Sequence, residues 1–107
     1  MVHKQITATN AKTTAIYRFI GKIVYIKVNN NEYVKQLIEQ IRAKGGSVIL
    51  QAGWMKCDMF GSHTEAKLGN TVIDMNTATE DSVQDILVDF FNNTLIASGF
   101  QTTITDL

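Results

Sequence analysis

Cys57, Asp58 and His63 are the residues of this sequence whose types and spacing could support nucleophilic catalysis. A cysteine thiolate needs a nearby base, and that base needs a third group to orient it. Cys57, however, alternates with Met55 and Met59 along a predicted strand, which favours a thiol that points into the core as a small hydrophobic group. No oxyanion-hole motif accompanies the three residues. We therefore predict a protein that is not an enzyme, and keep a small enzyme using Cys57 as a third alternative.

Metal and phosphate sites are not indicated by any motif. One cysteine and two histidines cannot supply the four nitrogen and sulfur ligands of a structural zinc site. The acidic segment Thr77–Asp85 lacks the repeating aspartate loop of a calcium site, and the first turn of a helix accounts for its carboxylates. Gly45-Gly46 precedes a predicted strand rather than a helix, the wrong order for a glycine-rich nucleotide motif. We expect no metal and no cofactor.

Charge is distributed unevenly along the chain, although the formal net charge is zero. Residues 1–56 hold nine lysines and arginines against two glutamates, whereas residues 57–107 hold one lysine against eight carboxylates. Asymmetry of this kind is a hint about binding partners. Alternatively, the two halves fold together and their charges neutralise each other across one surface. The sequence leaves both arrangements open.

Basic and aromatic residues are interleaved in a predicted hairpin, and one more aromatic and one more basic residue, Trp54 and Lys56, follow later in the chain. A sheet face of this kind can stack bases on its rings while its cations hold phosphates. No RRM or KH signature is present, and half-buried rings beside solvated lysines would give the same pattern. Alternation also places Tyr17 on the face opposite Arg18. The candidate residues of this basic and aromatic face are Tyr17, Arg18, Lys22, Tyr25, Lys27, Trp54 and Lys56.

Asp81, Asp85 and Asp89 follow one another at intervals of four, so they lie along one face of a predicted helix. Like charges at this spacing repel by a few tenths of a kcal/mol per pair, so helix stability does not account for them. A solvated helix face is the ordinary explanation, and a docking surface for a basic partner is the functional one. Because patches of opposite sign are complementary between copies, we also predict a homodimer with Asp85 and Asp89 among its polar contacts.

Composition predicts one compact domain that spans residues 1–107, with a hydrophobic share of 45% and no proline. The single cysteine allows no internal disulfide. The first residues are polar and lack the apolar core of a signal peptide. No apolar run approaches the roughly 20 residues that cross a bilayer. We expect a cytoplasmic protein without membrane association.

Two amphipathic helices are predicted. The first covers Asn29–Ala43, capped by Asn29 and ended by the glycine pair. The second begins at Thr77 or Thr79 and extends to Gly99. The expected core positions are Val34, Leu37, Ile38 and Ile41 in the first helix, and Val83, Ile86, Leu87, Phe90, Thr94 and Ala97 in the second.

Strands are predicted where β-branched and aromatic residues alternate with polar ones. Gly21 favours a tight hairpin between the second and third strands, and a bulge in one long strand is the alternative. Gly69-Asn70 favours a two-residue turn, whereas Thr64–Leu68 is ambiguous. The predicted strands are Lys4–Thr9, Thr13–Phe19, Lys22–Val28, Ser47–Ala52, Trp54–Phe60, Thr71–Met75 and Phe100–Thr105.

The element order is therefore βββ-α-βββ-α-β, which predicts an α+β domain with an antiparallel sheet and two amphipathic helices packed on it. For function we expect a protein–protein interaction module that acts as an inhibitor or adaptor by binding a larger enzyme. A small, proline-free, Asn- and Thr-rich domain resembles, in composition, the small accessory proteins of phages and mobile elements, and that resemblance implies this mode of action. The alternative is a nucleic-acid-binding protein that uses the hairpin Tyr17–Lys27. Both leave the identity of the partner open.

Overall fold

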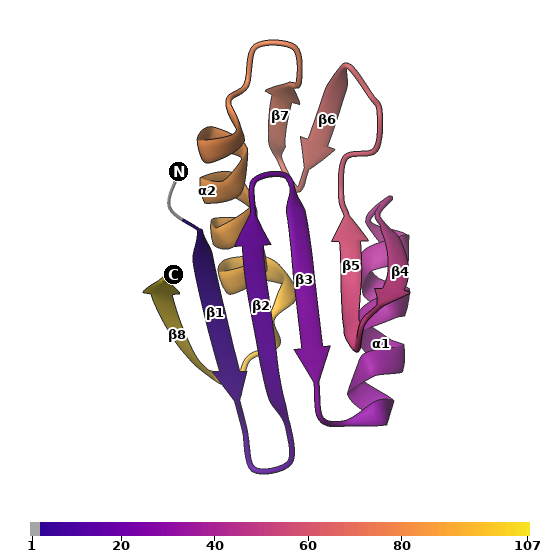
Figure 1. Cartoon of the computed structure of the whole chain (residues 1–107), viewed down its shortest axis with the longest axis vertical. Coiled ribbons are helices and arrows are strands. Elements are labelled where there is room, and N and C mark those ends of the chain that lie inside the picture. Colours follow the sequence, from indigo (N-terminus) through magenta and orange to yellow (C-terminus); the bar gives the residue numbers. More distant parts are fainter. Residues whose placement is uncertain (1–2) are drawn as a thin grey trace.

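A six-stranded antiparallel sheet forms the larger layer of the fold, as seen in a computed structural model that describes residues 3–107 (Figure 1). Its strand order is β4-β5-β3-β2-β1-β8. A separate hairpin pairs β6 with β7. The strands of the large sheet are β1 (Lys4–Thr9), β2 (Thr14–Ile20), β3 (Ile23–Val28), β4 (Ser47–Gln51), β5 (Trp54–Asp58) and β8 (Gln101–Asp106), and those of the hairpin are β6 (Glu65–Leu68) and β7 (Thr71–Asp74).

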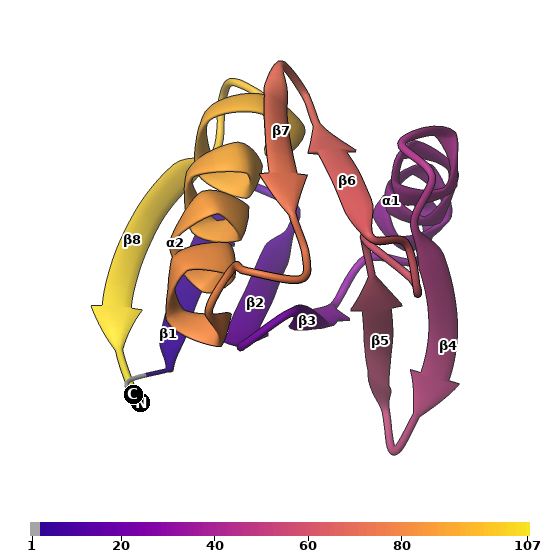
Figure 2. The same ribbon diagram turned by 90° about the horizontal axis from the view of Figure 1, so that it is seen from above.

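Two helices and the β6–β7 hairpin cover one face of the large sheet (Figure 2). The helices are α1 (Asn31–Ala43) and α2 (Glu80–Phe90), and α2 continues into a π-helical turn, η1 (Phe91–Leu95). The predicted α+β class is therefore confirmed, with the order βββ-α-ββββ-α-β. Within the described residues, no helix is both long enough and apolar enough to cross a membrane.

The core lies between the sheet and the helices. Alternate residues of the central strands point to this side and are fully buried, among them Tyr17 and Phe19 of β2. Phe91, the first residue of η1, packs edge-on against both rings, with centroid distances of 5.8 and 5.4 Å. Such edge-to-face pairs stabilise a core beyond the apolar area that they bury. Helices, sheet and hairpin all contribute to this one hydrophobic cluster.

Tight turns with residues at positive φ connect neighbouring strands. Gly21, with φ of +60°, closes the β2–β3 hairpin, in which Ile20 lies opposite Ile23. The hairpin prediction is therefore confirmed over a bulged single strand. Ala52 and Gly53 both have positive φ between β4 and β5, which is the geometry of a type I′ turn.

Two predicted details of the helices are corrected by the structure. The N-cap of α1 is Asn30, whose side chain accepts the backbone N–H groups of Glu32 and Tyr33. Asn29 instead accepts the backbone N–H of Thr14 at 2.8 Å and so links the segment after β3 to the start of β2. The second helix does not extend to Gly99, because it widens into η1 and the chain becomes extended at residue 96. This change of helical period exposes two residues predicted for the core, Thr94 and Ala97.

The predicted strand Trp54–Phe60 ends earlier, at Asp58. The carboxylate of Asp58 accepts the backbone N–H groups of Phe60 and Gly61, both at 2.9 Å, and so turns the chain. Phe60 is consequently buried rather than outward-facing. The ambiguous segment Thr64–Leu68 contains β6, whose Leu68 lies opposite Thr71 across the Gly69-Asn70 turn.

Candidate interaction face

The face of the large sheet opposite the helices carries no other described element, and it is the face turned toward the viewer in Figure 1. Because successive side chains of a strand alternate between faces, each strand contributes every second residue to this side. Cations and aromatic rings gather on its three central strands. We call this surface the cationic–aromatic face and define it by Arg18, Tyr25, Lys27, Trp54 and Lys56.

The strand register places these residues side by side. Arg18 of β2 lies opposite Tyr25 of β3, and Tyr25 lies opposite Lys56 of β5. Gln5 of β1 extends the same row on the other side of Arg18. Directly opposed side chains on one sheet face are about 5 Å apart at their Cβ atoms. The row therefore forms one continuous surface across four strands.

Trp54 is held between two cations. The guanidinium carbon of Arg18 lies 4.9 Å from the Trp54 ring centroid, and the Nζ atom of Lys27 lies 5.6 Å from it. The Arg18 Nε–H also donates to the side-chain oxygen of Gln5 at 3.0 Å, so the guanidinium is oriented from both sides. Cation–π contacts within about 6 Å are attractive by roughly 0.5–1 kcal/mol at exposed sites. Both contacts favour the observed orientation of the tryptophan ring.

A shallow hollow beside this ring is lined by Arg18, Ile20, Tyr25 and Trp54. Tyr25 and Trp54 are both half-buried, so each ring presents part of its surface to solvent. The hollow combines one cation with three apolar or aromatic walls. That chemistry suits a partner group that has a flat or apolar body and a negative charge beside it.

Carboxylates are nearly absent from this side of the sheet. Among the described strand residues that share it, Asp58 is the one acidic residue, and its carboxylate is engaged by the turn after β5. Arg18, Lys27 and Lys56 therefore give the cationic–aromatic face a net positive charge.

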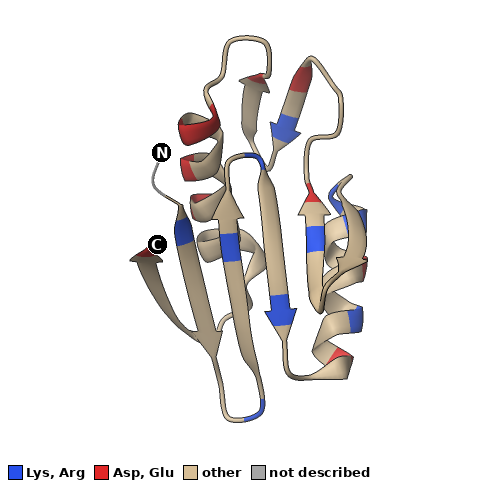
Figure 3. Ribbon diagram, in the orientation of Figure 1, with Lys and Arg blue, Asp and Glu red and all other residues tan. Residues whose placement is uncertain are grey.

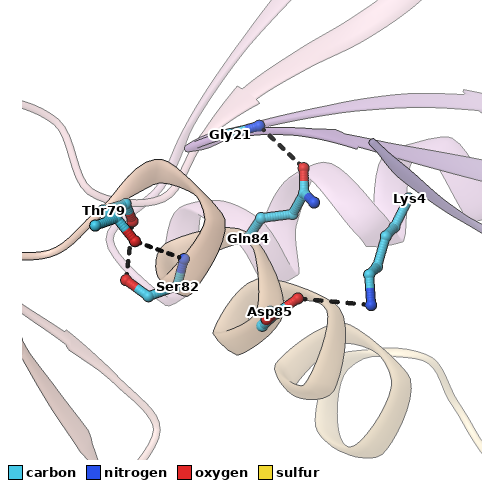
Figure 4. A network of polar contacts seen from close by, with 6 residues as sticks. All are labelled: Lys4, Gly21, Thr79, Ser82, Gln84 and Asp85. Carbon is cyan, nitrogen blue, oxygen red and sulfur yellow. Dashed lines mark hydrogen bonds and ion pairs between the residues drawn. The ribbon is translucent and has the colours of Figure 1, made fainter. Parts of the chain in front are cut away.

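The acidic residues of the second half lie on the other side of the molecule. Asp81, Asp85 and Asp89 are all exposed on α2, and Figure 3 shows this helix behind the sheet. Within residues 3–107 a single ion pair occurs, between Lys4 Nζ and Asp85 at 3.6 Å (Figure 4). Arg18, Lys27 and Lys56 thus lie on the face opposite these carboxylates, whereas Lys35 and Arg42 belong to α1 on the helix side. Direct pairing does not neutralise the charges of the two halves.

The structure brings together five of the seven basic and aromatic residues predicted from sequence and separates two. Tyr17 is a correction: it points to the helix side, is fully buried, and its hydroxyl lies 3.2 Å from that of Tyr33. Burial raises the pKa of Tyr17 well above its usual value. Lys22 lies in the β2–β3 turn rather than on a strand.

The three candidate catalytic residues are not assembled into a site. Cys57 is buried on the helix side, where burial raises the pKa of its thiol to about 12, so it is not activated as a nucleophile. Asp58, the next residue of the strand, faces the other side. His63 is exposed in the following turn. In the described part of the chain, no group of three or more potential ligands could hold a metal ion.

Gln5 belongs to this surface although the sequence reasoning did not select it. Gln5 alternates with the apolar Ile6 along the strand, so the sequence alone could have placed it on the outer side of β1. The adjacency of β3 and β5 could not be predicted from the sequence, because α1 and β4 separate these strands along the chain.

No family model matches the chain, and no curated protein or solved structure shows significant similarity to it.

Proposed function

We propose that this protein is a non-enzymatic interaction module that binds an acidic surface of a protein partner through its cationic–aromatic face. The observation that carries the proposal is the placement of Trp54 between Arg18 and Lys27 on an uncovered sheet. In this role the protein acts as an inhibitor or adaptor of a larger enzyme by covering part of its surface.

Residue chemistry supports this role. Tryptophan, tyrosine and arginine are the residue types most enriched among the energetic centres of protein interfaces. Here one of each lies on adjacent strands. Side chains on strands are held more rigidly than side chains on loops, so less conformational entropy is lost when a partner binds.

The charge of the surface defines the class of partner. Arg18, Lys27 and Lys56 lie on one face, and among the described strand residues the turn-bound Asp58 is the one carboxylate that shares it. A basic partner would be repelled, whereas an acidic one is attracted and steered toward the face. Steering of this kind mainly raises the association rate and weakens with added salt.

Affinity capture with matched charge reversals tests the proposal. The wild-type chain, an Arg18→Glu/Lys27→Glu variant and a Lys35→Glu/Lys44→Glu variant are immobilised and exposed to nuclease-treated native lysate. Both variants change the net charge equally, but the second alters the α1 region on the other side of the sheet. We expect a protein retained by the wild type to be lost from the first variant and kept by the second. Equal retention by all three chains would contradict the proposal.

Single-stranded nucleic acid is the second candidate partner for the same face. Tyr25 and Trp54 could stack two bases while the three cations hold phosphates. Trp54 is the only tryptophan in the chain, so its fluorescence reports binding of short oligonucleotides directly. This candidate predicts quenching with an affinity that falls steeply with salt. Unchanged Trp54 emission would eliminate it without affecting the first proposal.

A further inference from the structure

Strand β4 forms one edge of the large sheet, and no described element lies beyond it (Figures 1 and 2). Its Ile49 and Leu50 have 61% and 76% of their surface exposed, the largest values among the exposed large hydrophobic residues of the described chain. Soluble proteins usually protect such an edge with charges, proline or a bulge. Residues 47–51 contain no charge and no proline, and their register with β5 is continuous.

The backbone of β4 offers hydrogen-bonding groups to a further strand. In an antiparallel ladder, residue pairs alternate between hydrogen-bonded and non-hydrogen-bonded. The two-residue turn at Ala52-Gly53 makes Gln51 and Trp54 the hydrogen-bonded pair that closes the hairpin. The N–H and C=O groups of Val48 and Leu50 are therefore directed to the open side of the sheet.

The sequence of β4 is self-complementary in an antiparallel arrangement. It reads Ser-Val-Ile-Leu-Gln, polar at both ends and apolar at the three central positions. When two copies are aligned about Ile49, that residue lies opposite itself and Val48 lies opposite Leu50. Val48 and Leu50 are the two residues whose backbone groups face the open side, so this register also satisfies the hydrogen bonds.

We propose that β4 pairs with β4 of a second copy of this chain about a two-fold axis at Ile49. The axis is perpendicular to the sheet, so the two sheets join into one. The Ile49 side chains then meet on the outer face, and each Leu50 packs beside a Val48 on the helix side. The cationic–aromatic faces of both copies lie on the same side of the joined sheet. A partner with two acidic sites would thus be held bivalently, which raises its apparent affinity.

A dimer held by the cationic–aromatic face and the acidic residues of α2 is less consistent with the structure. A two-fold interface requires each copy to offer both patches on one side. The basic residues of the cationic–aromatic face and the acidic residues of α2 lie on opposite sides of the sheet. Contact between them would be head-to-tail rather than the same patch meeting itself about a two-fold axis. Because the β4 contact uses no charge, we expect the dimer to persist when salt is added.

Light scattering over a concentration series measures the molar mass of the protein in solution and so tests whether the dimer forms. We expect the wild type to approach twice the monomer mass at high concentration, in low salt and in high salt. Ile49→Lys places two cations opposite each other and is expected to restore the monomer. Val72→Lys is the control, because Val72 is similarly exposed at 59% but lies on β7. A monomeric wild type at every concentration, or a dimer that Ile49→Lys leaves unchanged, would overturn the proposal.

Disulfide trapping tests the register. In the proposed pairing, the Cα atoms of the two Ile49 residues are about 4.5 Å apart, within the range that a disulfide spans. The two Ser47 residues are displaced by four positions, roughly 14 Å. Under mild oxidation with oxidised glutathione, we expect Ile49→Cys to form a covalent dimer and Ser47→Cys to remain largely uncross-linked. The native Cys57 is buried and does not interfere. Equal cross-linking of both variants would exclude this register and with it the proposed interface.

Discussion

The backbone N–H of Gly21, at the tip of the β2–β3 hairpin, donates a hydrogen bond to the side-chain oxygen of Gln84 at 3.2 Å (Figure 4). Gln84 is one of two buried polar residues in the described chain. The contact joins segments separated by 63 positions. It joins α2 to the end of the strands that carry Arg18 and Tyr25, and so adds a polar contact to the packing of this helix on the sheet.

Gln84→Leu is expected to lower the free energy of unfolding by about 1–3 kcal/mol, because the Gly21 N–H loses its acceptor in a buried position. Urea unfolding measures the change. Gln36→Leu, at an exposed position of α1, is the control and should change the free energy by less than about 0.5 kcal/mol. A similar small change in Gln84→Leu would show that the contact does not tie the layers together.

Asn30→Ala is expected to destabilise the start of α1 by about 1 kcal/mol, because the N–H groups of Glu32 and Tyr33 lose their capping oxygen. Amide hydrogen exchange of these two residues should become faster. Asn29→Ala is the matched control: it should leave their exchange unchanged and accelerate exchange at Thr14 instead. Faster exchange at Glu32 in Asn29→Ala would identify Asn29 as the cap after all.

The element types could be predicted from local patterns, whereas several boundaries depend on tertiary contacts. Alternation in β1 to β3 and the apolar stripe of α1 are local signals, and both predicted correct elements. The end of α2 is not a local signal. Residues 91–95 carry a plausible helical pattern, but Phe91 packs against Tyr17 and Phe19, and the helix widens there.

The candidate face was only partly predictable for the same reason. Alternation alone predicts that Tyr25 and Lys27 share a side of β3. It also predicts that Arg18 and Tyr17 point to opposite faces of β2. Their proximity to Trp54 depends on β5 pairing with β3 after an intervening helix and strand. No local pattern encodes that adjacency. Sequence reasoning consequently selected five residues that share the outer face, but it also included the buried Tyr17 and the turn residue Lys22.

Arg18→Ala is expected to lower the free energy of unfolding by no more than about 1 kcal/mol, because its contact with the Trp54 ring is at the surface. The same substitution should weaken partner binding by a larger factor if the cationic–aromatic face is the binding surface. Urea unfolding and a binding titration with the captured partner separate the two effects. A loss of binding that merely tracks a loss of folded protein would assign Arg18 a structural role.

Alkaline pH is expected to destabilise the protein through the buried Cys57. The thiol has an ordinary pKa near 9 and a raised one of about 12 in the folded state, because burial disfavours the thiolate. Between these values the unfolded chain loses a proton that the folded chain keeps. The free energy of unfolding therefore falls as pH rises above about 9, by roughly 1.4 kcal/mol per pH unit for this group. Tyr17, whose pKa is also raised, adds to the fall at higher pH.

Urea unfolding of the wild type and of Cys57→Ala at about pH 8 and about pH 10.5 isolates the contribution of the thiol, because all other titrating groups are common to both chains. We expect the wild type to be the more stable chain at the lower pH, since the alanine leaves a small cavity in the core. At the higher pH, we expect the free energy of unfolding of the wild type, relative to that of Cys57→Ala, to be about 2 kcal/mol lower than at the lower pH. A difference that stays constant between the two pH values would show that Cys57 reaches solvent and titrates normally. The thiol would then be accessible enough for the catalytic role that its burial argues against.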